Sequence, residues 1–157
     1  MEYNIVYKKL ETNEETLKTK DLIMEYIKWL NYDLTFQNVD DELGNFPNNY
    51  KEPLGAFIIA KEGQDVIGCV GLKNLGNKIC EMKRLYVNDN FKGIGIGKKL
   101  TEKIIEEAKI KQYEKMRLDT LNTMETALNI YYKFGFYKIE PYYNNPYEGV
   151  VYLEKIL

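Results

Sequence analysis

Three glycines at alternate positions, Gly93, Gly95 and Gly97, could bring backbone N–H groups close to an anion. Lysines flank them at Lys92 and Lys98, and the apolar spacing that follows predicts a helix. Glycine permits this approach because it has no Cβ, and a helix N-terminus adds free N–H groups and partial positive charge. The stretch FKGIGIGKKL therefore indicates either a phosphate-binding loop or, without a ligand, a turn that enters a helix.

Two other phosphate motifs fit this loop poorly. The P-loop pattern G-x-x-x-x-G-K-[ST] would need glycine at Lys92 and a hydroxyl residue at Lys99. The dinucleotide pattern G-x-G-x-x-G matches Gly93 and Gly95 but meets a lysine at its third glycine, although Asp119 stands where a ribose-binding acid would. The preceding strand, MKRLYV, carries charges, whereas a central dinucleotide-fold strand is an unbroken apolar run. A Rossmann-like nucleotide-binding protein is therefore a disfavoured alternative.

Proton-transfer chemistry is limited by the absence of histidine from the chain. Ser-His-Asp and Cys-His catalysis and most catalytic zinc sites are excluded, and no metal site is expected. Acid–base work falls to Glu, Asp, Tyr, Lys, Cys or water. Cys69 and Cys80 lie in predicted strands, where we expect small buried apolar side chains rather than a disulfide.

The composition indicates an ordinary globular protein, 45% hydrophobic and 29% charged. At 157 residues the simplest expectation is a single domain, 1–157. The net charge of -2 argues against a nucleic-acid partner or an anionic membrane surface. No apolar run approaches the length of a membrane span, so we expect a cytoplasmic protein without a membrane partner.

The elements that must position the loop follow from apolar periodicity and turn residues. The predicted strands cover 3–10, 56–61, 66–72, 79–87, 115–121, 136–139 and 150–156. The predicted helices cover 17–30, 38–43, about 96–112 and 122–134. Asn122 is expected to cap the last helix, with Glu125 as its capping-box partner, and Gly135 to end it.

These elements predict a mixed sheet and an α/β (α+β) fold. Short turns between the three strands of 56–87 imply an antiparallel meander. The strand–helix–strand unit at 79–121 should be a right-handed crossover that joins two parallel strands. On strand 79–87, alternation places Glu81 and Lys83 on one face with Leu85 and Val87. Their alternate neighbours should share the opposite face: Cys80, Met82, Arg84 and Tyr86.

Three blocks of sequence resemble the GNAT N-acetyltransferase superfamily, and their order and spacing hold over about residues 55–157. KGIGIG (92–97) resembles its coenzyme A pyrophosphate loop, [QR]-x-x-G-x-[GA]. EMKRLYV (81–87) resembles the strand before that loop, and ALNIYYKFGF (127–136) resembles a late helix of pattern A-x-x-LY-x-K-x-GF.

Three positions depart from the family's pattern. Lys92 replaces Arg or Gln and keeps the charge without the forked geometry. Asp89 replaces a frequent proline, and Met124 replaces a frequent asparagine. These departures bear on single contacts to the cofactor.

The resemblance implies a GNAT-like, largely antiparallel mixed sheet with flanking helices and a splayed central pair of parallel strands. Acetyl-coenzyme A would lie between the splayed strands 79–87 and 115–121. The N–H of Val87 would polarise the acetyl carbonyl. The edge that bonds the pantetheine would be Leu85, Tyr86 and Val87. The pyrophosphate would be held by Lys92, Gly93, Ile94, Gly95, Ile96, Gly97 and Lys98.

The reaction that the resemblance implies is direct attack of an amine on the thioester. Tyr131 matches the family's helix tyrosine and is the candidate acid for the leaving thiolate; the alternative is a purely structural tyrosine in the core. Glu81 falls where several members carry the general base and could act through water. The alternative is a carboxylate paired with Lys83 or Arg84.

The acceptor wall would come from the early helices and the last hairpin. Its candidate residues are Trp29, Tyr32, Phe36, Tyr142 and Asn145. Such an aromatic and amide lining suits a primary amine of a small molecule or an amino acid, although each tyrosine could equally be ordinary surface or core. An edge-to-edge homodimer is a further implication. The alternative function is an acyl-coenzyme A-binding sensor or regulatory module without turnover; Glu81 and Tyr131 favour an enzyme.

Overall fold

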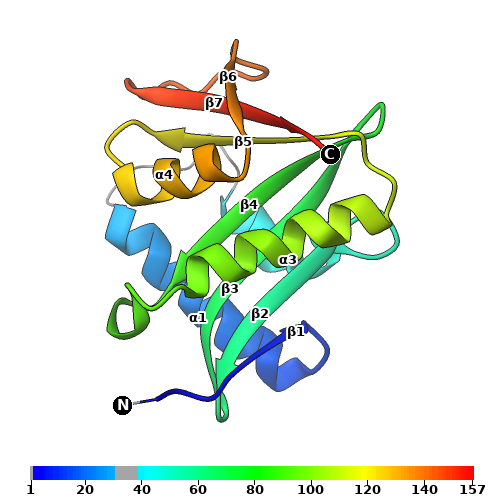
Figure 1. The fold of residues 1–157 in the computed structure, drawn as a ribbon. Helices are drawn as coiled ribbons and strands as arrows, with labels where there is room; N and C mark the ends of the chain where they lie inside the picture. Colours follow the sequence, from blue (N-terminus) through cyan, green and yellow to red (C-terminus); the bar gives the residue numbers. More distant parts are fainter. Residues whose placement is uncertain (1, 31–38) are drawn as a thin grey trace.

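The fold is built on one mixed sheet (Figure 1). The structure, a computed structural model, describes residues 2–30 and 39–157, with the backbone alone for 39 and 40. Seven strands of the described chain lie in the order β1-β2-β3-β4-β5-β7-β6. They are β1 (Ile5–Lys9), β2 (Ala56–Glu62), β3 (Asp65–Gly76), β4 (Ile79–Val87), β5 (Lys115–Leu121), β6 (Tyr137–Ile139) and β7 (Val150–Ile156).

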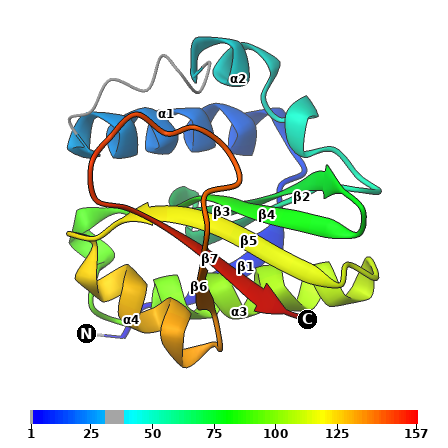
Figure 2. The same ribbon diagram turned by 90° about the horizontal axis from the view of Figure 1, so that it is seen from above.

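Helices cover both faces of this sheet. They are α1 (Asn13–Leu30), α2 (Val39–Asn45), α3 (Ile96–Ile110) and α4 (Glu125–Lys133), with short 3-10 turns η2 (Asn48–Tyr50) and η3 (Asp89–Phe91). Figure 2 shows α3 and α4 on one face and α1 and α2 on the other. The segment between β6 and β7, residues 140–149, arches out on the side of α1 and is called the β6–β7 loop below (Figure 2).

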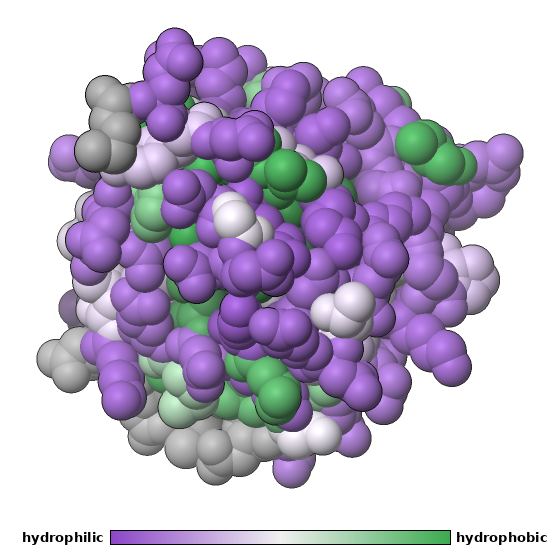
Figure 3. Space-filling view, turned by 90° about the horizontal axis from the view of Figure 1, so that it is seen from below, coloured by the Kyte–Doolittle hydropathy of each residue, from purple (hydrophilic) through white to green (hydrophobic). Residues whose placement is uncertain are grey.

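Each face has its own apolar core. An apolar stripe along α3 forms part of the larger core: Ile96, Leu100, Ile104 and Ala108. The second core joins α1 to the opposite face of the sheet through Leu22, Ile23, Phe57, Ile59 and Tyr86. On the face seen in Figure 3, hydrophilic residues predominate and hydrophobic ones gather only in small groups. Within the described residues, no helix is long and apolar enough to cross a membrane.

Helix α1 begins at Asn13, four residues before the predicted start, because a capping box precedes it. The N–H of Glu15 donates to Thr12 Oγ1 and the N–H of Thr12 donates to Glu15 Oε1, both at 3.1 Å. The same buried carboxylate accepts from Lys8 Nζ at 2.6 Å and Lys61 Nζ at 3.1 Å. Glu15 therefore ties the start of α1 to strands β1 and β2.

Strand β4 contains a bulge that the sequence did not predict. Cys69 of β3 pairs with Tyr86, but Gly71 pairs with Lys83, so one residue of β3 faces two of β4. Arg84 sits in the bulge with φ +58°, in the left-handed region.

The bulge corrects the predicted alternation along β4. Before it, Cys80 and Met82 pack in the α3-side core. After it, Leu85 and Val87 pack against that same core. Tyr86 packs in the core of the α1 side. The predicted grouping is wrong because one inserted residue moves every later side chain to the other face.

The sequence prediction is right for the C-terminal end of α4 and wrong for its N-terminal cap. Asn122 does not cap the helix: its N–H donates to Gly149 O at 2.8 Å, and the capping position is Met124, without a side-chain cap. Gly135 ends the helix as predicted, with φ +94°. Its N–H donates to Tyr132 O and the next N–H donates to Tyr131 O, which is a Schellman motif. This ending fixes the last turn of α4, which carries Tyr131.

Both cysteines are free and buried, as predicted. Burial raises the pKa of the Cys69 and Cys80 thiols to about 12. Neither thiol therefore has the thiolate character that nucleophilic catalysis requires.

Candidate functional site

The central parallel pair of strands is open along more than half of its length. Strand β4 pairs with β5 only at Ile79, Cys80 and Glu81, and the two strands diverge beyond that point (Figure 1). Leu85, at the far end of β4, therefore has no partner on β5. Two adjoining cavities, of about 600 and about 130 Å³, lie along this opening. Both cavities are lined by Tyr26, Leu85, Met124 and Ala127.

The larger cavity gathers most of the predicted cofactor residues. They are Leu85, Tyr86, Val87, Lys92, Gly93, Gly95, Ile96, Gly97 and Lys98. Ile94 is outside this lining, with half of its side chain exposed. Residues from β4, η3, the start of α3 and the start of α4 thus surround one space.

The glycine loop presents free backbone donors to this cavity. Gly93 and Gly95 have φ of +82° and +92°, conformations that favour glycine. A Cβ built on either residue would meet nothing within 4 Å, so the backbone is open to a ligand. Within the described chain, the N–H groups of Gly93, Ile94 and Gly95 have no protein acceptor. Gly95 caps α3 without a side-chain hydrogen bond. This arrangement fits a diphosphate.

Lys92 and Trp29 lie together at the mouth of the larger cavity. Lys92 Nζ is 2.7 Å from Asp89 Oδ1 and 4.3 Å from the centre of the Trp29 ring. This is the geometry of a cation–π contact. Trp29, predicted to face the acceptor, is thereby placed beside the glycine loop and is not part of the smaller cavity's lining.

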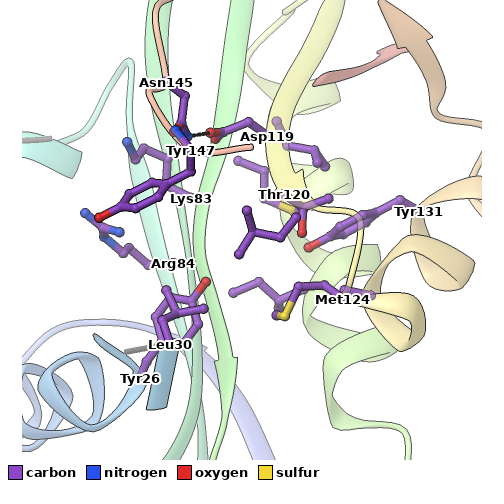
Figure 4. Close-up of a pocket in the computed structure, with 15 residues that line it drawn as sticks. Tyr26, Leu30, Lys83, Arg84, Asp119, Thr120, Met124, Tyr131, Asn145 and Tyr147 are labelled. Carbon is purple, nitrogen blue, oxygen red and sulfur yellow. Dashed lines mark hydrogen bonds between the residues drawn. The ribbon is translucent and has the colours of Figure 1, made fainter. Parts of the chain in front are cut away.

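The smaller cavity passes from one face of the sheet toward the other (Figure 4). Tyr131 enters it from α4, and its ring packs in the α3-side core. On the far side lie Lys83 and Arg84 of β4, and Asp119 of β5 lies beside the opening. Asn145 from the β6–β7 loop also lines the space, as do Tyr26 and Tyr147.

Tyr131 has the properties of a proton donor. Its side chain is buried, and its hydroxyl points into the smaller cavity (Figure 4). That hydroxyl makes no hydrogen bond within the part of the chain that the structure describes. Burial raises the pKa of Tyr131 above its ordinary value, so the group stays protonated at neutral pH.

Glu81 lies behind the cavity and not in its lining. Its Oε2 accepts a hydrogen bond from the Tyr142 hydroxyl at 2.7 Å, and its Oε1 lies 3.8 Å from Lys83 Nζ. Burial, and then the charge of Glu81, raise the pKa of Tyr142. Tyr142 therefore covers the carboxylate that the sequence suggested as a base.

Asp119 is a site residue that sequence reasoning missed. It lines the smaller cavity, and its Oδ2 accepts from the Tyr143 hydroxyl and from Asn145 Nδ2, the latter at 3.1 Å. The sequence suggested it only as a ribose-binding acid in the disfavoured alternative. The available signal was its position on the predicted strand 115–121, which the family resemblance places at the splayed pair.

A buried ion pair joins α2 to Arg84, which lines the smaller cavity. Arg84 Nε donates to Glu42 Oε2 at 2.7 Å, and the Tyr50 hydroxyl donates to Glu42 Oε1 at 3.1 Å. Burial alone would raise the pKa of Glu42, but the charge of Arg84 and the hydrogen bonds from Arg84 and Tyr50 together outweigh it and hold that pKa below its usual range. The β4 bulge thus supplies the cation that fixes the neighbouring helix.

The remaining predicted site residues lie at different distances from the smaller cavity or outside the described residues. Asn145 lines the smaller cavity, whereas Tyr142 reaches the site only through Glu81. Tyr32 and Phe36 lie outside the described residues. Among the residues that are described, no group of three or more Cys, Asp or Glu could hold a metal ion.

Sequence comparison identifies the family. The model of the acetyltransferase (GNAT) family matches residues 21–136. A protein from Schizosaccharomyces pombe, named as an uncharacterized N-acetyltransferase, is 43% identical over 136 residues, which are 85% of this chain and 83% of that protein. An uncharacterized N-acetyltransferase from Dictyostelium discoideum is 32% identical over 90% of this chain and 94% of its own length.

Structural comparison agrees with the fold. The PaiA N-acetyltransferase of Thermoplasma acidophilum, solved in complex with coenzyme A, superimposes with a TM-score of 0.77. That match covers 98% of this chain and 99% of the other, at 21% sequence identity. With a matching family model, named relatives and a sheet that splits at its parallel pair, the chain belongs to the GNAT family of acetyltransferases and is an N-acetyltransferase.

Proposed function

We propose that this protein transfers the acetyl group of acetyl-coenzyme A to the primary amine of a small molecule or an amino acid. The observation that carries the proposal is the split between β4 and β5, with free backbone donors at one end and Tyr131 and Asp119 at the other. The PaiA relative of the same fold, which is solved with coenzyme A, supports the choice of cosubstrate.

The cosubstrate would extend along the larger cavity. The N–H groups of Gly93, Ile94 and Gly95 and the start of α3 would hold the diphosphate. The unpaired edge of β4 from Leu85 to Val87 would bond the pantetheine amides, which satisfies backbone groups that have no strand partner. The N–H of Val87 would then stabilise the oxyanion that forms on the acetyl carbonyl.

Transfer requires one bond to form and one to break. The neutral amine attacks the carbonyl carbon, the new N–C bond forms, and the C–S bond breaks. The nitrogen loses one proton in forming the amide, and the leaving sulfur gains one. Tyr131 would donate that proton, because its hydroxyl is protonated and points into the cavity.

The proton leaving the amine has two candidate acceptors. Asp119 lines the cavity and could take it directly or through water. Glu81, the sequence-based candidate, would need a relay through Tyr142 or water because that tyrosine covers it. Asp119 is favoured because it lines the cavity, whereas Glu81 is buried outside the lining.

The alternative that the sequence left open was a sensor that binds acyl-coenzyme A without turnover, and the match to N-acetyltransferases argues against it. Both functions need the glycine loop, but only the enzyme needs an acid and a base along the smaller cavity. The presence of Tyr131 and Asp119 there favours the enzyme.

The test measures thiol release from acetyl-coenzyme A by the purified protein with a mixed panel of amines and amino acids. Amine-dependent thiol release, with the acetylated product identified by mass spectrometry, supports the proposal. Tight binding of acetyl-coenzyme A by calorimetry without thiol release from any amine would favour the sensor. Preferential binding of NAD would exclude both.

A further inference from the structure

Two opposite charges face the opening from its two sides. Glu81 of β4 is the last residue that pairs with β5, and its partner is Arg117. Two residues further along each strand are Lys83 and Asp119, which both line the smaller cavity. Because the strands have parted there, this lysine and this aspartate stand across the split from each other.

Lys83 is a largely buried cation that has an ion-pair partner, Glu81, but no hydrogen-bond acceptor among the described residues. Its side chain is 17% exposed, and its Nζ lies 3.8 Å from Glu81 Oε1, which is too long for a hydrogen bond. Glu81 already accepts a hydrogen bond from Tyr142. Within the described residues the ammonium donates no hydrogen bond, and burial lowers the pKa of Lys83. An anion placed beside it would supply the missing acceptor.

Asp119 is engaged on one oxygen only. Tyr143 and Asn145 both donate to Oδ2, and no residue in the described ranges donates to Oδ1. Within those ranges Asp119 and Lys83 also make no ion pair with each other. Asp119, which can accept a proton, and Lys83, which can donate hydrogen bonds, therefore lie on opposite sides of one cavity.

This arrangement complements a molecule that carries an ammonium and a carboxylate on the same carbon atom. We propose that the acceptor is a free α-amino acid whose zwitterionic head bridges the parted strands, with its ammonium on Asp119 and its carboxylate on Lys83. The inference rests on the proposed function, since it names the acceptor of that same site. A simple monoamine would leave Lys83 without an acceptor, at a cost in binding.

The bound head group also defines the proton path. Asp119 or water takes one proton from the ammonium to give the neutral amine. The amine attacks the carbonyl carbon of the thioester, so that the N–C bond forms and the C–S bond breaks. The departing sulfur takes a proton from Tyr131, and the second proton of the nitrogen passes through water to restore the Tyr131 hydroxyl. The products are an N-acetyl amino acid and free coenzyme A. The carboxylate takes no part in the chemistry and serves to orient the amine.

The experiment compares amino acids with their decarboxylated partners as acceptors: phenylalanine with phenethylamine, leucine with isopentylamine, and methionine with its decarboxylated amine. Thiol release gives kcat/KM for each. We expect at least one amino acid to exceed its partner by about 10- to 100-fold, the contribution of a hydrogen bond to a charged group. In Lys83→Gln that ratio falls to about one, and Lys83→Arg restores most of it.

The matched control is Lys78→Gln, which removes an exposed lysine 3.8 Å from Glu114 and outside both cavities. It should keep the wild-type ratio. Monoamines that react as well as amino acids in the wild-type protein, or a ratio that Lys83→Gln leaves intact, would overturn the amino acid assignment while the proposed function stands. Preferred turnover of phosphoethanolamine would likewise overturn the carboxylate assignment. Lack of reaction with every amine in the panel defeats the proposed function itself.

Discussion

At the scale of single residues, the site depends on where one hydroxyl and one glycine are held. Tyr131 sits in the last turn of α4, and its ring packs edge-on against Phe136 at 5.8 Å. The ring is thus fixed by the core, while the hydroxyl is free to serve a ligand. Packing and the proposed proton transfer would therefore use different atoms of the same side chain.

Tyr131→Phe should separate these two roles. The ring keeps its packing, so we expect the melting temperature to stay close to the wild-type value. Loss of the proton donor should lower kcat on the order of a hundredfold, with little change in the affinity for coenzyme A. Steady-state kinetics and calorimetry measure the two effects. Unchanged kcat in the folded variant would return Tyr131 to a structural role.

Gly97 offers a cleaner probe of the cofactor loop than Gly95, whose positive φ would strain any other residue. A Cβ at Gly97 would lie 3.8 Å from Val87 and 3.9 Å from Ile130, which is ordinary contact. The longer side chain of Gly97→Leu would extend into the larger cavity. We expect coenzyme A affinity to fall about 10- to 100-fold, as overpacking costs about 1–3 kcal/mol.

The control for this variant is Lys99→Leu, two residues along the helix, where the native side chain is 45% exposed. It adds the same leucine away from the cavity and should bind coenzyme A as the wild-type protein does. Equal affinities of Gly97→Leu and Lys99→Leu would contradict placement of the cofactor in the larger cavity.

At the scale of elements, the bulge in β4 connects the sheet to α2. It turns Arg84 toward Glu42, and both side chains are less than a tenth exposed. Removing one partner of a buried pair costs more than the pair contributes, because the remaining charge keeps its desolvation. Helix α2 is therefore held by an interaction that depends on a single irregular residue of β4.

Glu42→Gln should destabilise the fold by about 3 kcal/mol, because it removes the carboxylate that faces the buried guanidinium. Urea unfolding monitored by circular dichroism gives this free energy. The comparison is Glu114→Gln, which disrupts the exposed pair with Lys78 and should cost less than about 1 kcal/mol. Similar costs for the two variants would mean that the buried pair does not anchor α2.

At the scale of the whole molecule, the ionisable groups predict how stability varies with pH. The pKa of Glu15 is about 2: burial opposes ionisation, but hydrogen bonds from Lys8 and from backbone N–H groups outweigh it. Burial also opposes ionisation of Glu154, yet hydrogen bonds from Tyr137 and Arg117 lower its pKa. A carboxylate whose pKa is lower in the folded than in the unfolded state stabilises the protein at pH values above its unfolded pKa. That contribution is lost as the pH falls through the folded pKa.

We therefore expect stability to be flat between about pH 5 and 7, where no histidine titrates, and to decline from about pH 4.5 toward pH 2. Urea midpoints across that range measure the profile. Glu15→Gln should flatten the acid limb as well as lower stability at pH 7. A large loss of stability between pH 7 and 5 would contradict this account.

The local sequence determined the elements and the glycine loop. Alternating apolar residues, short turns and helical spacing are properties of neighbouring residues, so they predicted the strand and helix order, the mixed sheet and the Gly135 helix end. The loop of 92–97 was identifiable for the same reason, because its glycines and lysines are adjacent in the chain.

Only the tertiary structure decided which face of β4 each side chain occupies and which charged groups come together. The bulge at Arg84 arises from pairing with β3, and one inserted residue reverses all later side chains, which no local alternation can reveal. Asp119 became a site residue because β5 parts from β4 at that point, and Glu81 was covered because Tyr142 folds back from 61 residues away. Contacts between distant segments depend on strand register and on the path of the loops. Neither can be read from the residues that neighbour the contact in the sequence.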